Sequence, residues 1–296
     1  MYTFLRYVVF LTVLAGAAFW WMTEPARVSE ADIAGITGDA ARGEMVFRAG
    51  GCAACHSAPA AEAEARLILS GGRAFASDFG TFYAPNISPD PVHGIGGWQM
   101  IDLANAMRHG TAPDGRHYYP AFPYTSYARV AMQDIADLWA YLRTLPASDQ
   151  PDRAHEVGFP FSLRRPLGGW KLLFVGSGKV ITGDLSPEAV RGRYLAEGLG
   201  HCGECHSPRN ALGGIDYERW LSGAPNPAGK GRIPNITPAE LDWSEADLVE
   251  YFTSGFTPDY DSAGGEMAEV IENLSQLPEE DRRAIAAYLK AVPAVK

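Results

Sequence analysis

A chain of 296 residues is longer than one small domain requires, so the sequence predicts two domains. Apolar residues make up 47% of the chain and charged residues 20%, a balance that argues against both a disordered chain and a polytopic membrane protein. The net charge of −10 argues against a nucleic acid partner, because binding to phosphates requires a basic face.

The first segment of the chain, 4–22, is apolar apart from Arg6 and one threonine. About 20 helical residues cross a hydrocarbon layer of roughly 30 Å, so residues 1–25 are predicted to form a transmembrane anchor or uncleaved signal. Arg6 suits the cytoplasmic interface of the membrane, and the three aromatic residues at 19–21 suit the opposite interface. We therefore expect a single-pass protein of the cytoplasmic membrane with its C-terminal domains in the periplasm. A cleaved signal peptide is the alternative, because small residues at 15–17 resemble a cleavage site.

Two stretches of the chain repeat the same blocks in the same order, which indicates tandem domains. CAACHSAP, which begins at Cys52, corresponds to CGECHSPR, which begins at Cys202, and APNIS corresponds to IPNIT further along. Each copy then has a Trp, an Asp-Leu pair and a Gly at matching spacing, followed by an Ala-Tyr-Leu block and a Pro. We therefore expect domains at 36–147 and 188–296, joined by a linker at 148–187.

Each copy is predicted to be mainly helical. First helices are expected at about 40–50 and 188–200, just before the cysteine pairs. Last helices are expected at about 134–145 and 278–291, where apolar residues recur at helical spacing. A middle helix follows the tryptophan of each copy, and in the second copy it begins with a capping box. Strand-like alternation is scarce, so the predicted fold class is mainly α.

The linker contains the run FPFSLRRPLGGWKLLF at 159–174. The aromatic side chains of this run predict packing across the two domains instead of a floppy tether. They are Phe159, Phe161, Trp170 and Phe174. A membrane-surface role for the same basic and aromatic run is the alternative.

All four cysteines lie in CxxC pairs that a histidine follows directly. These residues are Cys52, Cys55 and His56 in the first copy and Cys202, Cys205 and His206 in the second. A disulfide framework or a zinc site could use the cysteines, but neither explains the histidines. CxxCH is the signature of covalent haem c attachment, in which both thiols bond to the porphyrin and the histidine ligates the iron. Two covalently attached haem c groups are therefore the predicted cofactors, with His56 and His206 as metal ligands.

With these motifs the chain resembles the class I cytochrome c fold and, more closely, the dihaem cytochrome c subunits associated with membrane-bound bacterial dehydrogenases. The resemblance covers about residues 38–294 and also rests on the runs HYYPAFPYTSY and GGEMAEV and on the two AYL helices. It implies two tandem class I cytochrome c domains. In each domain the first and last helices would cross, with Tyr141 and Tyr288 packed against the helices that bear Gly43 and Gly192.

The resemblance also implies what surrounds each iron. The backbone carbonyl of Pro85 or Pro234 would accept a hydrogen bond from the proximal histidine and so fix its ring. Met267, in the GGEM run, lies on the loop where this family supplies an axial methionine. The second haem is therefore predicted to have His/Met ligation, which raises its reduction potential. The aligned residue of the first copy is Phe122, which cannot bind iron.

Three possibilities are therefore open for the sixth coordination position of the first haem iron. His117, on the same loop as Phe122, would give a bis-histidine haem of lower potential. Met132 is a nearby thioether, although its place at the start of the last helix also suits packing. The third possibility is an iron without a sixth protein ligand, screened by Phe122.

These features predict an electron carrier and not an enzyme. A dehydrogenase or quinol-oxidising complex would reduce one haem, and a terminal oxidase or soluble cytochrome would accept the electron from the other. The expected partners are thus redox proteins, together with the membrane through the N-terminal helix. The alternative is a haem enzyme of the peroxidase or thiosulfate dehydrogenase type, or a gas sensor, that uses an open first haem.

Overall fold

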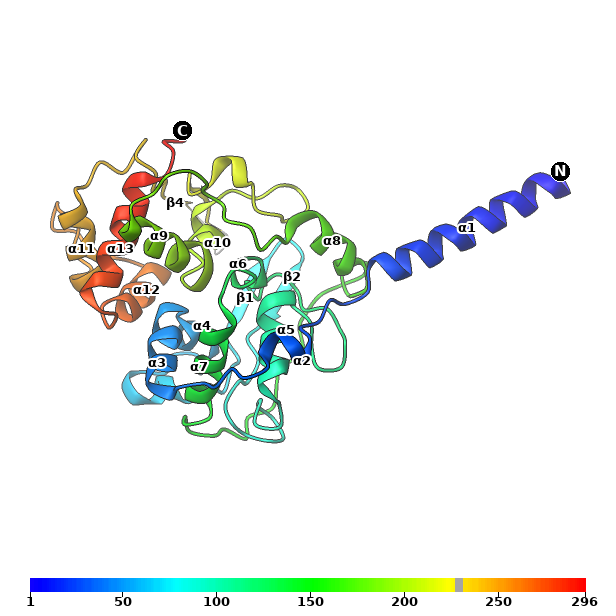
Figure 1. The fold of residues 1–296 in the computed structure, drawn as a ribbon, viewed down its shortest axis with the longest axis horizontal. Coiled ribbons are helices and arrows are strands. Elements are labelled where there is room, and N and C mark those ends of the chain that lie inside the picture. Colours follow the sequence, from blue (N-terminus) through cyan, green and yellow to red (C-terminus); the bar gives the residue numbers. More distant parts are fainter. Residues whose placement is uncertain (227–230) are drawn as a thin grey trace.

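The computed structural model describes residues 1–226 and 231–296. One long helix, α1 (Tyr2–Met22), projects from a body made of short helices and loops (Figure 1). The mean hydropathy of α1 is 1.6 and none of its residues is buried, so its length and composition suit a membrane span. The mainly helical fold and the apolar N-terminal helix are confirmed.

Both copies of the sequence repeat form helices in the same order. The first copy contains α2 (Glu30–Ile33), α3 (Ala40–Ala49), α4 (Cys52–His56), η1 (Ala63–Leu67), α5 (Met100–His109), α6 (Tyr124–Tyr127) and α7 (Met132–Leu142). The linker contains α8 (Pro166–Phe174). The second copy contains α9 (Pro187–Tyr194), the π-helical turn η2 (Leu195–Leu199), α10 (Gly203–His206), η3 (Tyr217–Arg219), α11 (Glu245–Ser254), α12 (Glu266–Leu274) and α13 (Glu279–Ala291).

Each copy also has a small antiparallel sheet. It lies between the CxxCH helix and the middle helix. In the first copy β1 (Ala74–Ser77) pairs with β2 (Gly80–Tyr83), and in the second β3 (Ala224–Pro225) pairs with β4 (Arg232–Ile233). Each pair ends just before a Pro-Asn-Ile segment, so both sheets fix the start of that segment.

The first and last helices of each copy cross in direct backbone contact, as the resemblance implied. A Cβ atom on Gly43 would lie 1.9 Å from the carbonyl oxygen of Asp137 in α7. A Cβ atom on Gly192 would lie 1.8 Å from the carbonyl oxygen of Ala284 in α13. The β-carbons of Tyr141 and Tyr288 lie beside these glycines. Only glycine allows helices to approach this closely, so the two crossings define the core of each copy.

The two copies pack directly on each other (Figure 1). The hydroxyl of Tyr194 in α9 donates to Asp134 in α7 and accepts a hydrogen bond of 3.2 Å from the backbone nitrogen of Ala131. The ring of His201, just before α10, lies 3.3 Å from the carbonyl oxygen of Gly50. The ends of α3 and η2 therefore meet, and the two CxxCH helices that follow them lie near this contact.

The linker contacts both copies, and its aromatic residues divide into two groups. The Trp170 indole donates to the Leu212 carbonyl of the second copy at 2.8 Å, and Phe174 packs on Gly214. For these two residues the prediction of packing across the domains is confirmed. Phe159 is 82% exposed, and Phe161 touches Phe79 but is still 49% exposed. For these two the prediction is wrong, because aromatic content alone does not determine which surface a ring faces.

Candidate haem sites

Each CxxCH motif forms a single helical turn with its two cysteines as free thiols. Burial is the main cause that raises the pKa of Cys52 and of Cys202 to about 12, and the pKa of Cys55 and of Cys205 to about 11. The thiols are therefore neutral at pH 7. Within the described residues, no group of three or more His, Cys, Asp or Glu side chains could hold a metal ion, so the zinc alternative has no ligand set there.

The histidine of each motif has one nitrogen fixed by a backbone carbonyl. His56 Nδ1 donates to the carbonyl oxygen of Pro85 at 2.9 Å, and His206 Nδ1 donates to that of Pro234 at 2.8 Å. A carbonyl can only accept, so the proton lies on Nδ1 and the Nε2 lone pair is left to bind iron. Burial lowers the pKa of both histidines, which favours this neutral form. The carbonyl contact that the resemblance implied is confirmed in both copies.

The Pro-Asn-Ile segments hold these carbonyls in place. The side-chain oxygen of Asn86 accepts from the backbone nitrogen of Ser88 at 2.9 Å, and Asn235 accepts from Thr237 at 2.8 Å. Each asparagine amide also donates to the chain that follows the last helix of its copy, at Ser148 or Val295. The asparagines are buried, so each loop is locked from both sides and the histidine contact is rigid.

The two candidate sites lie close together across the contact between the copies. The pKa of Cys55 is influenced, after burial, by Arg73 and by Glu266, Glu269 and Cys205 of the second copy. Arg73 connects the sites directly, because its guanidinium donates both to the Ala54 carbonyl inside the first motif and to Glu269. A pair of redox groups in these sites would be neighbours within one protein.

The cytochrome c family matches residues 40–146 of the chain. A dihaem cytochrome c-type protein of Cereibacter sphaeroides is 64% identical over 286 residues, which cover 97% of each of the two chains. The chain belongs to the dihaem cytochrome c family. This membership confirms the resemblance drawn from the motifs and agrees with the two predicted haem c groups.

Subunits of bacterial dehydrogenases are also similar to this cytochrome. The fructose dehydrogenase cytochrome subunit of Gluconobacter japonicus is 40% identical over 86% of the chain and 52% of its own length. The cytochrome c subunit of the quinone alcohol dehydrogenase of Gluconacetobacter polyoxogenes is 36% identical over 96% of the chain and 60% of its own length. The chain thus spans between half and two thirds of these two longer relatives.

Met267 is the second residue of α12, where it is partly buried against the core. The first copy holds this helix by two ion pairs that the sequence did not suggest. Arg73 pairs with Glu269, and Arg66 pairs with Glu272. The helix that carries the predicted axial methionine is therefore fixed from the opposite copy, and the ligation itself stays a prediction.

His117 lies between the end of α1 and α8, where both of its ring nitrogens have protein partners. Nε2 donates to the carbonyl oxygen of Thr23 at 3.0 Å, and Nδ1 accepts from the Lys171 ammonium group at 3.0 Å. The side chain is 3% exposed, and burial is the main cause that lowers its pKa. Iron ligation by His117 stays a prediction, and it would require one of these two hydrogen bonds to break.

The other two predicted groups at the first haem lie in apolar contacts. Met132 is the first residue of α7 and packs partly buried against the core. The ring of Phe122 packs on the rings of Tyr118, Tyr124 and Tyr127, at centroid distances of 5.9, 6.5 and 5.5 Å. We call these four residues the aromatic cluster.

Tyr127 brings the aromatic cluster beside the first cysteine pair. Burial and, after it, the proximity of Cys52 and Cys55 raise the pKa of Tyr127. Tyr127 ends the HYYPAFPYTSY run, but its place beside the cysteines could not be told from a place in the core until the fold was known. The cluster therefore adds a candidate wall for the first site.

Proposed function

We propose that this dihaem cytochrome relays electrons outside the cytoplasmic membrane, from a membrane-bound dehydrogenase or quinol-oxidising complex to a downstream oxidase or cytochrome. The observation that carries the proposal is that the same arrangement of thiols and histidine occurs twice in one chain. Each time, a CxxCH turn presents two free thiols and a histidine whose Nε2 has no part in the proline contact. The relatives named as cytochrome subunits of fructose and alcohol dehydrogenases support a dehydrogenase as the electron donor.

The residues proposed to hold the haems are the two motifs themselves. Cys52 and Cys55, and in the second copy Cys202 and Cys205, would form the thioether bonds. His56 and His206 would each present Nε2 to iron while the proline carbonyl holds the other nitrogen. Haem c, when bound, supplies one-electron chemistry at iron, and the protein sets its potential through ligands, burial and hydrogen bonds.

The proposed organisation is two tandem class I cytochrome c domains, at 36–147 and 188–296, joined by the linker at 148–187. The crossings at Gly43 and Gly192 support it, since each joins the first and last helices of one copy. The ion pairs between the copies support a fixed relative placement. A fixed placement suits a relay, because electron transfer depends on a constant separation of the two groups.

Helix α1 is the proposed single-pass anchor. Its hydropathy and exposure support this role, and so does the packing of its last turn on the body. The Arg165 guanidinium lies 4.1 Å from the centre of the Trp20 ring and donates to the Thr23 hydroxyl at 2.9 Å. Removal of a signal peptide at residues 15–17 would leave the last turn of α1, which packs on the body, at the new N-terminus of the chain. Membership in a cytochrome c family supports a location outside the cytoplasm.

The mass of the purified full-length protein tests the haem proposal. We expect the mass of the chain plus two haems, with the residues of α1 retained. Replacing both Cys52 and Cys55 with alanine should leave one covalently bound haem, because the second motif is untouched. Denaturing gels stained for haem provide the control for covalent attachment. A wild-type protein that carries one haem or none would overturn the proposal.

A haem enzyme or gas sensor is the second candidate function, and the surroundings of the first site support it. Phe122 stands where the second copy has Met267, and both nitrogens of His117 are engaged elsewhere. These observations support a first haem that lacks a sixth protein ligand. Such an iron would be open to a small molecule, whereas the second would be closed by Met267.

Carbon monoxide binding to the reduced protein separates the two candidates. An enzyme or sensor with an open first iron should bind the ligand at that haem, and a Phe122→Met variant should lose most of this binding because a thioether would close the position. Optical titration of the reduced protein measures both. If the wild-type protein binds no carbon monoxide, both haems are six-coordinate, and the enzyme and sensor candidates lose their support.

A further inference from the structure

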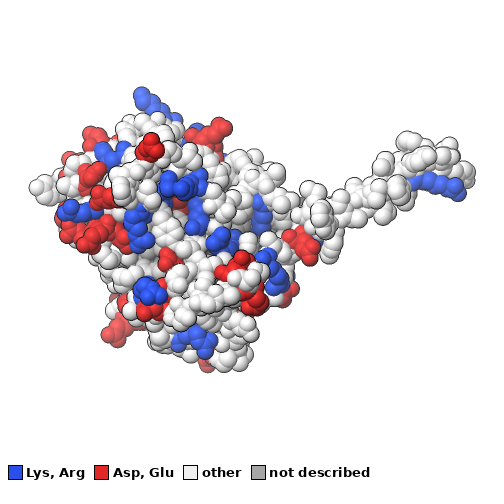
Figure 2. Space-filling view, in the orientation of Figure 1, with Lys and Arg blue, Asp and Glu red and all other residues white. Residues whose placement is uncertain are grey.

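Large apolar side chains gather on the outside of the linker, between 159 and 174. Phe159 is 82% exposed, Leu173 71%, Leu172 61%, Leu163 54% and Phe161 49%. Scattered single apolar residues are ordinary on a protein surface, but this many in one short segment mark an interaction site. In Figure 2 uncharged atoms dominate the body next to the base of α1, with acidic and basic side chains at the base itself.

Two of these residues lie on the outer face of helix α8, because its opposite face packs against α1 and the body. Gly168 touches α1, since a Cβ atom there would lie 2.5 Å from the Thr23 carbonyl oxygen. The Lys171 ammonium group donates to the carbonyl of Gly110 at 2.6 Å, and Trp170 donates to the second copy. Leu172 and Leu173 therefore point away from the body.

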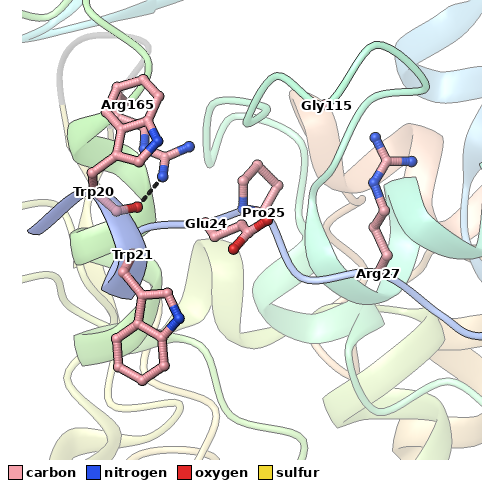
Figure 3. Close-up of a pocket in the computed structure, with 7 residues that line it drawn as sticks. All are labelled: Trp20, Trp21, Glu24, Pro25, Arg27, Gly115 and Arg165. Carbon is pink, nitrogen blue, oxygen red and sulfur yellow. Dashed lines mark hydrogen bonds between the residues drawn. The ribbon is translucent and has the colours of Figure 1, made fainter. Parts of the chain in front are cut away.

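Helix α8 is also held at the point where α1 leaves the body. The Arg165 guanidinium stacks on the Trp20 ring and donates to the Trp20 carbonyl, one of the last carbonyls of α1 (Figure 3). Carbonyl groups at the end of a helix lack hydrogen-bond partners within that helix. The Arg165 contact therefore gives the Trp20 carbonyl a partner and holds α1 and α8 together. The level of α1 in a bilayer thus determines the level of α8.

The hollow beside this junction has the chemistry of a membrane interface. It has a volume of about 380 Å³, and Figure 3 shows its lining. The lining residues are Trp20, Trp21, Glu24, Pro25, Arg27, Gly115 and Arg165. Tryptophan is a side chain that gathers at the level of lipid headgroups. The end of α1 is thus at the interface, with α8 beside it.

We propose that the segment at 159–174 lies on the outer surface of the lipid bilayer, with Leu172 and Leu173 inserted among the acyl chains. The inference rests on the proposed anchor, since α1 carries the segment to the membrane. A bilayer is the occupant because the exposed apolar residues belong to the segment that packs on the last turn of α1, through Gly168 and Arg165. This second contact fixes the orientation of the haem-carrying body on the membrane.

A spin label at Leu173 tests the proposal in the full-length, haem-loaded protein. The Leu173→Cys variant, with its haems in the oxidised state, is labelled and reconstituted into vesicles of phosphatidylcholine and phosphatidylglycerol. We expect collisions with oxygen, which concentrates in lipid, to exceed those with a water-soluble nickel chelate, as for a label at Leu14 within α1. A label at Tyr260, which is 92% exposed between α11 and α12 at the far end of the body from α1, should show the opposite preference.

A Leu173 label that behaves like the Tyr260 label would overturn the proposal. So would a label that becomes shielded from the chelate only after a dehydrogenase is added, since a protein would then be the occupant. The haem content and the mass of the whole protein are measured on the same samples. The mass shows whether α1 is retained, so a failure of the haem or anchor proposal can be distinguished from a failure of the membrane contact at α8.

The orientation of the haems gives a second readout that does not depend on labelling. In oriented multilayers, replacing both Leu172 and Leu173 with serine should broaden the angular distribution of the haem spin-resonance signals. Tyr260→Ser, which changes an exposed residue far from α1, should leave the distribution unchanged. An unchanged distribution in the double variant contradicts a membrane contact at α8.

Discussion

Replacing Met267 with alanine should lower the reduction potential of one haem by roughly 0.1 to 0.3 V, a fraction of the span of about 0.8 V over which axial ligands set haem potentials. A thioether sulfur stabilises ferrous iron relative to ferric iron, so its loss favours the oxidised state. The absorption band near the red edge that accompanies His/Met ligation should disappear as well. A redox titration followed optically measures both changes on the same sample.

Two further variants separate ligation from packing. Val270→Ala shortens a partly exposed side chain of the same helix, α12, and should change neither the band nor the potentials. Met267→His keeps a sixth ligand but replaces sulfur with nitrogen, so the potential should fall while the haem stays closed to carbon monoxide. If Met267→Ala leaves the band and both potentials unchanged, the second haem has another ligand.

The position of Met267 depends on the opposite copy, which links the two haem sites. Arg66 and Arg73, on the stretch that follows the first CxxCH motif, pair with acidic residues of α12. Arg73 also bonds to the backbone of the first motif at Ala54. The surroundings of one candidate site therefore support the ligand of the other. A chain cut between the copies would lose this support even if each half folded.

The chemistry-bearing motifs could be predicted because each is local. The CxxCH spacing is contained in one helical turn, and the repeat revealed the equivalence of Pro85 and Pro234 from letters alone. The crossings at Gly43 and Gly192 followed from the resemblance to a known fold. Features that are repeated or local leave a pattern in the sequence.

Contacts between distant parts of the chain could not be predicted in the same way. Arg73 and Glu269 are unremarkable surface charges in the sequence, and no period or motif connects them. The same holds for His117, whose partners Thr23 and Lys171 lie in an N-terminal helix end and in the linker. A side chain that looks free for a metal in the sequence is thus engaged once three separate segments come together.

Replacing Gly192 with alanine should destabilise the second copy of the repeat by roughly 3 kcal/mol, because overpacking a tight contact costs about 1 to 3 kcal/mol and this one meets backbone. For a domain of about this size the change lowers Tm by on the order of 10 to 20 °C. The added Cβ atom would lie 1.8 Å from the Ala284 carbonyl oxygen, so α9 and α13 must separate. Calorimetry measures the shift.

The neighbouring Tyr288 makes this contact less able to relax than its counterpart at Gly43. The Tyr288 hydroxyl donates to buried Glu197 at 2.8 Å and accepts from the Trp220 indole at 3.0 Å, so the ring is anchored at its far end. Gly192→Ala should therefore cost more than Gly43→Ala. Gly169→Ala in α8 is the control, since its Cβ atom would meet Thr23 at an ordinary 3.8 Å. Equal Tm values for the Gly192 and Gly169 variants would mean that α9 and α13 are not in backbone contact, and the other apolar contacts of the second copy would then have to hold these helices.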